Sequence, residues 1–161
     1  DLITTDVYAD FNPNYSTYWN VFMIPIDGQL NLILAGNEVT VYFSQLIDGF
    51  FDFTNPTVFQ KAQNINGIDY GTPLDAAYIR GNFYFHATAT QSNGEDWAIL
   101  KFGRDGDYLE KKYEFLNLTS DFRPYSAQFK FDSASQTFRA YTAGCSSDLN
   151  LGMCSMNVPI Q

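Results

Sequence analysis

The single histidine of this 161-residue chain is the first place to look for acid–base chemistry. A nucleophilic triad requires a histidine to carry the proton, and His86 is the only one that the chain offers. His86 stands in a stretch of alternating apolar and polar residues, with Tyr and Thr residues on its own face. We therefore interpret it as a hydrogen-bonded structural residue, and we assign no catalytic residue.

Paired carboxylates are the second kind of chemistry to consider. Glycosidases place two acids on either side of the scissile bond, and both sheet sandwiches and propellers can carry such a pair. The candidates, chosen by their positions in expected strands or loops, are Asp52, Asp69, Asp75, Glu95 and Asp96. Separation in sequence does not fix the distance between carboxyl groups, and any acidic surface offers as many. A glycosidase-like hydrolase is therefore the third-ranked hypothesis.

Aromatic rings close to amide and carboxylate groups are the most useful indication of ligand binding. A flat ring provides an apolar platform and Asn or Asp provides directional hydrogen bonds, as a sugar or a protein surface requires. Two tyrosines surround a loop near the N-terminus, and another lies in the longest expected loop, 61–73. The candidate ligand-binding residues are Tyr15, Tyr18, Asn64, Asp69 and Tyr70. The alternative is that these rings fill the core of an aromatic-rich sheet protein.

The overall charge and the absence of motifs exclude several classes of function. The net charge of −9 repels phosphates, which disfavours nucleic acids and anionic membranes as partners. The sequence contains no nucleophile elbow, phosphate-binding glycine loop or zinc-binding helix motif. We therefore expect no cofactor, no metal site and no membrane insertion.

The cysteines and the glycosylation sequons indicate a compartment. Cys145 and Cys154 are separated by eight residues across an expected turn, so they could form one disulfide, the alternative being two free thiols in a reducing cell. Asn14 and Asn117 stand in sequons that could accept an N-linked glycan. Together these features favour a secreted or cell-surface protein. The chain begins at Asp1 without a signal peptide, which we interpret as a mature form or an excised piece.

Strands must position all of these residues, because no segment shows a sustained helical period. Residues 83–89 alternate between apolar and polar, which predicts a strand with one buried face. Residues 97–102 are apolar on both faces, which predicts a strand covered on both sides. An Asp-Gly turn at 105–106 and a charged edge strand at 108–115 complete a β-meander.

The parts of this meander recur along the chain. Trp19 precedes Asp27 by eight positions, just as Trp97 precedes Asp105, and a Gly follows each Asp. At these residues, and at the Gly-Asn pairs of 36–37 and 81–82, the chain resembles the blades of β-propellers. The resemblance implies one all-β domain of repeated antiparallel meanders, with units at about 5–32 (partial), 36–64, 74–115 and 126–161. A β-sandwich built from the same hairpins is the alternative.

These observations predict a non-enzymatic interaction or structural module, either complete or part of a larger repeat protein or assembly. Its partner would be another protein, a second copy of the chain or a glycan. A carbohydrate-binding lectin of the same architecture is the second-ranked hypothesis.

Overall fold

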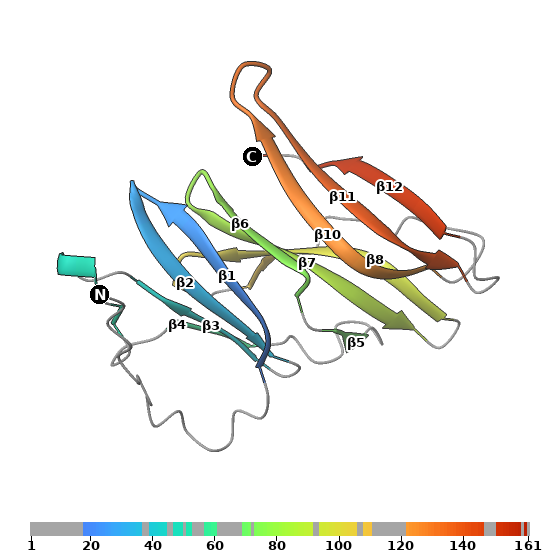
Figure 1. Ribbon diagram of the computed structural model, residues 1–161, viewed down its shortest axis with the longest axis horizontal. Coiled ribbons are helices and arrows are strands. Elements are labelled where there is room, and N and C mark those ends of the chain that lie inside the picture. Colours follow the sequence, from blue (N-terminus) through green and yellow to red (C-terminus); the bar gives the residue numbers. More distant parts are fainter. Residues whose placement is uncertain are drawn as a thin grey trace, which may run out of the picture.

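The protein is all-β, as the sequence predicts. The computed structural model describes residues 18–36, 39–44, 47–49, 51–52, 57–60, 69–71, 73–91, 94–105, 108–110, 122–146, 151–158 and 160. Within these ranges the backbone forms three small antiparallel sheets and one short 3-10 turn, η1 (Ile47–Gly49) (Figure 1).

Each sheet is built from strands that follow one another in the sequence. The N-terminal sheet has the order β1 (Tyr18–Ile26), β2 (Gln29–Gly36), β3 (Val39–Phe43) and β4 (Thr57–Gln60). The middle sheet contains β5 (Asp69–Tyr70), β6 (Asp75–Ile79), β7 (Asn82–Gln91), β8 (Gly94–Gly103) and β9 (Tyr108–Glu110), with β5 and β6 both paired to β7. The C-terminal sheet has the order β10 (Phe122–Asp132), β11 (Thr137–Ser146) and β12 (Leu151–Asn157).

The middle sheet lies between the other two sheets. Figure 1 shows β6, β7 and β8 between the β1–β4 sheet on the left and the β10–β12 sheet at the upper right. Both β1 and β10 pack against β6, so the three sheets meet along strands that come early in each of them. Among the described residues the sheets do not close into a ring. The structure thus establishes the all-β class and shows no closed propeller.

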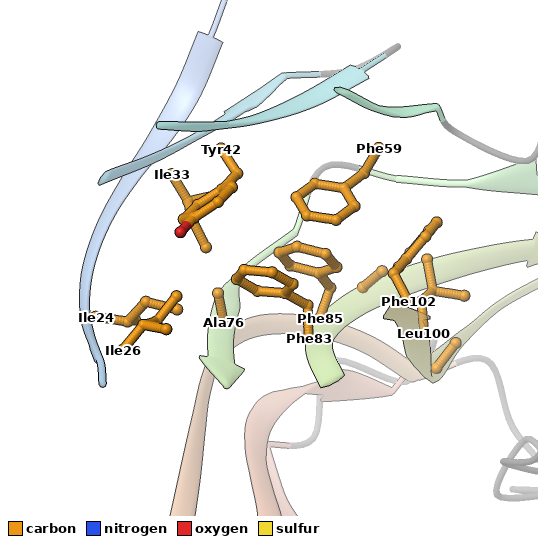
Figure 2. Packing of buried hydrophobic residues seen from close by; sticks show 12 residues of the cluster. Ile24, Ile26, Ile33, Tyr42, Phe59, Ala76, Phe83, Phe85, Leu100 and Phe102 are labelled. Carbon is orange, nitrogen blue, oxygen red and sulfur yellow. The ribbon is translucent and has the colours of Figure 1, made fainter. Parts of the chain in front are cut away.

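The first contact between sheets is an aromatic cluster. Phe59 of β4 is 1% exposed, and its ring lies 5.0 to 5.4 Å from the rings of Phe83, Phe85 and Phe102 in the middle sheet. Ring pairs in these edge-to-face geometries add to the free energy of burial. Figure 2 shows the side chains of the N-terminal sheet facing those of β7 and β8 across this contact.

The second contact covers the opposite face of the middle sheet. Tyr84, Trp97 and Ile99 pack there against Phe138 and Ala140 of β11. The prediction for 97–102 is therefore confirmed, since β8 is buried on both faces. The prediction for 83–89 is wrong in one respect, because Tyr84 and the neighbouring His86 are fully buried as well. The C-terminal sheet covers this second face of β7, and the alternation within the strand does not reveal that partner.

Turn chemistry joins the strands where the sequence predicts it. Asp27 and Gly28 have φ values of 52° and 79° and link β1 to β2 as a two-residue hairpin, which requires positive φ at both positions. Residues 126–131 pair with 137–143, also as predicted. The expected edge strand 108–115 is described as β9 over its first three residues, and the rest of it lies outside the described residues.

The expected repeat units can be placed on these sheets. The unit 74–115 overlaps the middle sheet, and the unit 126–161 overlaps the C-terminal sheet. The units 5–32 and 36–64 share the N-terminal sheet, where β2 pairs with both β1 and β3.

Replacing Phe59 by Ala should lower the free energy of unfolding by about 3 to 5 kcal/mol, since it opens a cavity among three rings. Phe131→Ala is the matched control, because Phe131 is 40% exposed and its loss should cost about 1 kcal/mol or less. Urea denaturation followed by tryptophan fluorescence measures both. Equal losses for the two variants would contradict the assigned core.

Candidate functional site

The predicted ligand-binding residues are spread over more than one sheet. Tyr18 begins β1 opposite Gly36, whereas Asp69 and Tyr70 form β5 at an edge of the middle sheet. Tyr15 and Asn64 lie outside the described residues, as do the sequon residues Asn14 and Asn117. Asp69 and Tyr70 are therefore consecutive residues of one short strand, and Tyr18 lies in a different sheet.

The candidate carboxylates are also dispersed. Asp52 follows η1, and its backbone N–H donates to the carbonyl oxygen of Ser44 at 2.8 Å. Asp69 and Glu95 both stand opposite Thr90, from β5 and β8 respectively, and Asp96 follows Glu95 along β8. Asp75 lies in β6, and both of its carboxyl oxygens accept hydrogen bonds.

The carboxylate of Asp75 joins two sheets. Its Oδ2 accepts a hydrogen bond from the backbone N–H of Phe129 in β10 at 2.6 Å, and its Oδ1 accepts one from the N–H of Ala76 at 2.8 Å. Burial raises the pKa of this carboxyl group, although the two hydrogen bonds act in the opposite direction. Both oxygens are thus engaged by backbone donors, so Asp75 fixes β10 onto β6.

His86 stands directly opposite Asp75 in the register of β6 and β7, and it is fully buried. The indole Nε1–H of Trp97 donates to its Nδ1 at 2.9 Å, and the two rings stack at 5.1 Å. Because Nδ1 accepts, the imidazole carries its proton on Nε2, which has no hydrogen-bond partner among the described residues. Burial lowers the pKa of His86 to about 3, so the ring is neutral at physiological pH. The expected hydrogen bond of His86 is confirmed.

The predicted disulfide is wrong, because Cys145 and Cys154 are not bonded to each other in the structure. Cys154 stands opposite Thr142 and Cys145 stands opposite Leu151 in the pairing of β11 with β12. Cys145 and Thr142 are three positions apart on one strand, so the two cysteines project from opposite faces of the sheet. A disulfide needs Cβ atoms about 4 Å apart, which this register does not allow.

An apolar face on the N-terminal sheet is the first feature that the sequence analysis missed. Cross-strand pairs of β1 and β2 line the side turned away from the middle sheet, and we call this side the outer apolar face. Its members are Val21 with Leu34, Met23 with Leu32, and Pro25 with Leu30. Val21, Met23 and Leu30 are 60%, 62% and 44% exposed. The sequence does contain a pattern that predicts apolar residues on both faces of this hairpin. Both strands carry apolar residues at odd and at even positions, as 97–102 does.

The outer face of the C-terminal sheet is the second missed feature. Two shallow hollows adjoin there at Tyr141, with volumes of about 230 and 390 Å³. The smaller hollow contains Lys130 and Arg139, and the larger contains Gln128 and Met153. Strand alternation could have placed these side chains on one face, but only the register shows which of them are neighbours.

Neither a metal centre among the described residues nor a similar protein indicates what this chain does. Within the described ranges, His, Cys, Asp and Glu side chains form no group of three or more that could hold a metal ion. Of the helices in the described part of the chain, none is long and apolar enough to span a membrane. No family model, curated protein or solved structure gives a significant match to the chain.

The burial of His86 predicts acid sensitivity. Its pKa is lower in the folded protein than the usual 6.5, so its contribution to stability is complete above pH 6.5 and is lost as pH falls towards about 3. At about 1.4 kcal/mol per pKa unit, up to about 5 kcal/mol is lost across that window. His86→Gln cannot titrate and should remove this part of the pH dependence.

Urea titrations of both proteins between about pH 7 and about pH 4 measure the difference. The contribution of His86 to stability is complete near the first value and largely lost near the second. The raised pKa of Asp75 acts in the opposite direction, because a carboxyl group with a raised pKa stabilises the fold at low pH and loses that effect as pH rises. Since Asp75 is present in both proteins, the comparison isolates His86. Identical pH profiles would contradict its assignment as a buried neutral base.

Because Cys145 and Cys154 form no disulfide with each other, we predict a simple labelling result. Iodoacetamide added in denaturant without a reductant should alkylate both Cys145 and Cys154, and mass spectrometry should find two adducts per chain. Prior reduction should leave this count unchanged. Labelling that appears only after reduction would show that the two residues form a disulfide.

Proposed function

We propose that the chain is a non-enzymatic interaction module whose outer apolar face stacks against a further β-sheet. The observation that supports the proposal is the set of six apolar side chains on one side of β1 and β2, three of them more than 40% exposed. Contiguous apolar patches are uncommon on soluble monomers and usually mark an interaction surface.

The way this chain packs its own sheets favours a sheet as the occupant. The inner side of the same hairpin carries Ile24, Ile26 and Ile33, which pack on the middle sheet. The outer side presents aliphatic residues in matching cross-strand pairs, so it has the surface chemistry that the chain already uses for stacking. Sheets stacked in series along one chain are typical of propeller blades, and we propose a propeller-like arrangement on this ground.

A second copy of this chain is the occupant that we propose. The six positions of the outer apolar face carry no charge, so two copies can meet face to face without opposing like charges. The outer face of the C-terminal sheet is a poorer partner, because Lys130 and Arg139 would lose hydration against aliphatic side chains. We therefore propose a symmetric dimer through the two N-terminal sheets.

We place this module outside the cell or on its surface. The proposal now depends on the two sequons alone, since the cysteines do not form the expected disulfide.

Met23→Lys should convert a dimer into a monomer, because the substitution buries an unpaired ammonium group at an apolar contact. We expect the dissociation constant to rise at least about tenfold, which corresponds to about 1.4 kcal/mol. Sedimentation velocity over a concentration series measures the mass against the 18.3 kDa of one chain. Met153→Lys is the control, because Met153 is 87% exposed and lies on the C-terminal sheet.

The control variant should retain the association of the parent protein. A parent chain that remains monomeric at every concentration would overturn the proposed dimer. A dimer that Met153→Lys dissociates and Met23→Lys does not would move the interface to the other end of the molecule.

A further inference from the structure

Two cations stand side by side on the outer face of the C-terminal sheet. Lys130 of β10 is directly opposite Arg139 of β11, and both side chains are exposed in the smaller hollow. Like charges at directly opposed positions destabilise a sheet. Neither residue forms an ion pair with any other residue that the structure describes. The pair therefore does not stabilise the sheet, and its charge is available to a ligand.

The nearby carboxylate of Asp132 is already hydrogen-bonded. Its Oδ1 accepts from the backbone N–H of Ala134 at 3.0 Å, and its Oδ2 accepts from the hydroxyl of Ser135 at 2.6 Å. The hydrogen bond from Ser135 lowers the pKa of Asp132, with a smaller contribution from the charge of Lys130. Asp132 thus holds the β10–β11 turn, although its charge offsets part of the positive field.

Arg139 is oriented by its other neighbour. Its Nε donates to the amide oxygen of Asn157 in β12 at 3.0 Å. This hydrogen bond holds the guanidinium plane while the terminal nitrogens have no partner among the described residues. A planar guanidinium fixed in this way can bind a carboxylate through two parallel hydrogen bonds.

Tyr141 connects the charged hollow to the larger one. Its side chain is 37% exposed and lines both hollows, so one flank of the ring faces the cations and the other faces the larger hollow. Hydroxyl and amide side chains line the two hollows that meet at this ring, namely Ser126, Gln128, Ser135, Thr137 and Ser155. An aromatic ring among many short hydrogen-bonding groups fits a polyhydroxylated ligand.

We propose that this face binds an acidic saccharide, with a sugar carboxylate between Lys130 and Arg139 and the sugar ring against Tyr141. The saccharide chain continues into the larger hollow towards Gln128. The net charge of −9 opposes dense polyanions, so the site suits spaced carboxylates better than a nucleic acid. The proposal is independent of the dimer, which uses the opposite end of the molecule.

Isothermal titration calorimetry with a galacturonate oligosaccharide tests the proposal. Lys130→Gln and Arg139→Gln should each weaken binding at least about tenfold, since each removes a charge-assisted hydrogen bond. Tyr141→Ala should weaken it through loss of the ring platform, and added salt should weaken it as well. Arg104→Gln is the matched control, because it removes an exposed cation that pairs with Asp27 away from this face.

Five outcomes can overturn the proposal. A neutral oligosaccharide of the same length that binds equally well would remove the role of the cations. Tighter binding of an oligoglutamate peptide would reassign the face to acidic proteins, and tighter binding of a sulfated oligosaccharide would replace the carboxylate by a sulfate. Absence of binding, or an equal loss in Arg104→Gln, would exclude the site. Met23→Lys should bind the galacturonate oligosaccharide normally, so a failure of the proposed dimer and a failure of this site are distinguishable. Circular dichroism checks that each variant is folded.

Discussion

The burial of the middle sheet on both faces is the constraint on which the rest of the structure depends. Strands β7 and β8 carry large apolar side chains on both sides, with Phe83 and Phe85 on one and Tyr84 and Trp97 on the other. Such a sheet is stable in water only when two layers cover it. The N-terminal and C-terminal sheets therefore take their places because each buries one of these faces, and the surfaces for which we propose functions lie on the sides that they turn outward.

The two contacts between the sheets differ in their chemistry. The contact with the N-terminal sheet is dominated by rings and aliphatic groups, centred on Phe59. The contact with the C-terminal sheet includes polar groups, since Asp75 binds the backbone of Phe129 and His86 accepts from Trp97. The directional hydrogen bond between Asp75 and Phe129 fixes the position of β10 in a way that apolar packing alone does not. Asp75 and His86, which the sequence analysis considered for catalysis, thus form hydrogen bonds where the two sheets meet.

The two outer faces are unlike each other, which gives the molecule two different ends. One is aliphatic and uncharged at the described positions, with Met23 and Val21 exposed. The other combines Lys130, Arg139 and Tyr141 with many short polar side chains. Apolar surface favours association with another apolar surface, whereas hydrated cations favour an anionic ligand. A protein that binds a saccharide at one end and its own copy at the other would present two ligand sites per dimer.

Local physics in the sequence determined the all-β class, the Asp27-Gly28 hairpin and the pairing of 126–131 with 137–143, because alternation and positive φ are properties of a few adjacent residues. The sequence also predicted the burial of β8 on both faces, since the apolar residues of this strand fall on both of them. The tertiary structure alone decided that His86 is buried, that Cys145 and Cys154 project from opposite faces, and that Lys130 faces Arg139. These facts depend on which sheet covers which face and on the register between strands, and both are set by contacts between residues far apart in the chain. The candidate binding faces belong to this second group, which is why the tyrosines chosen from the sequence do not include Tyr141.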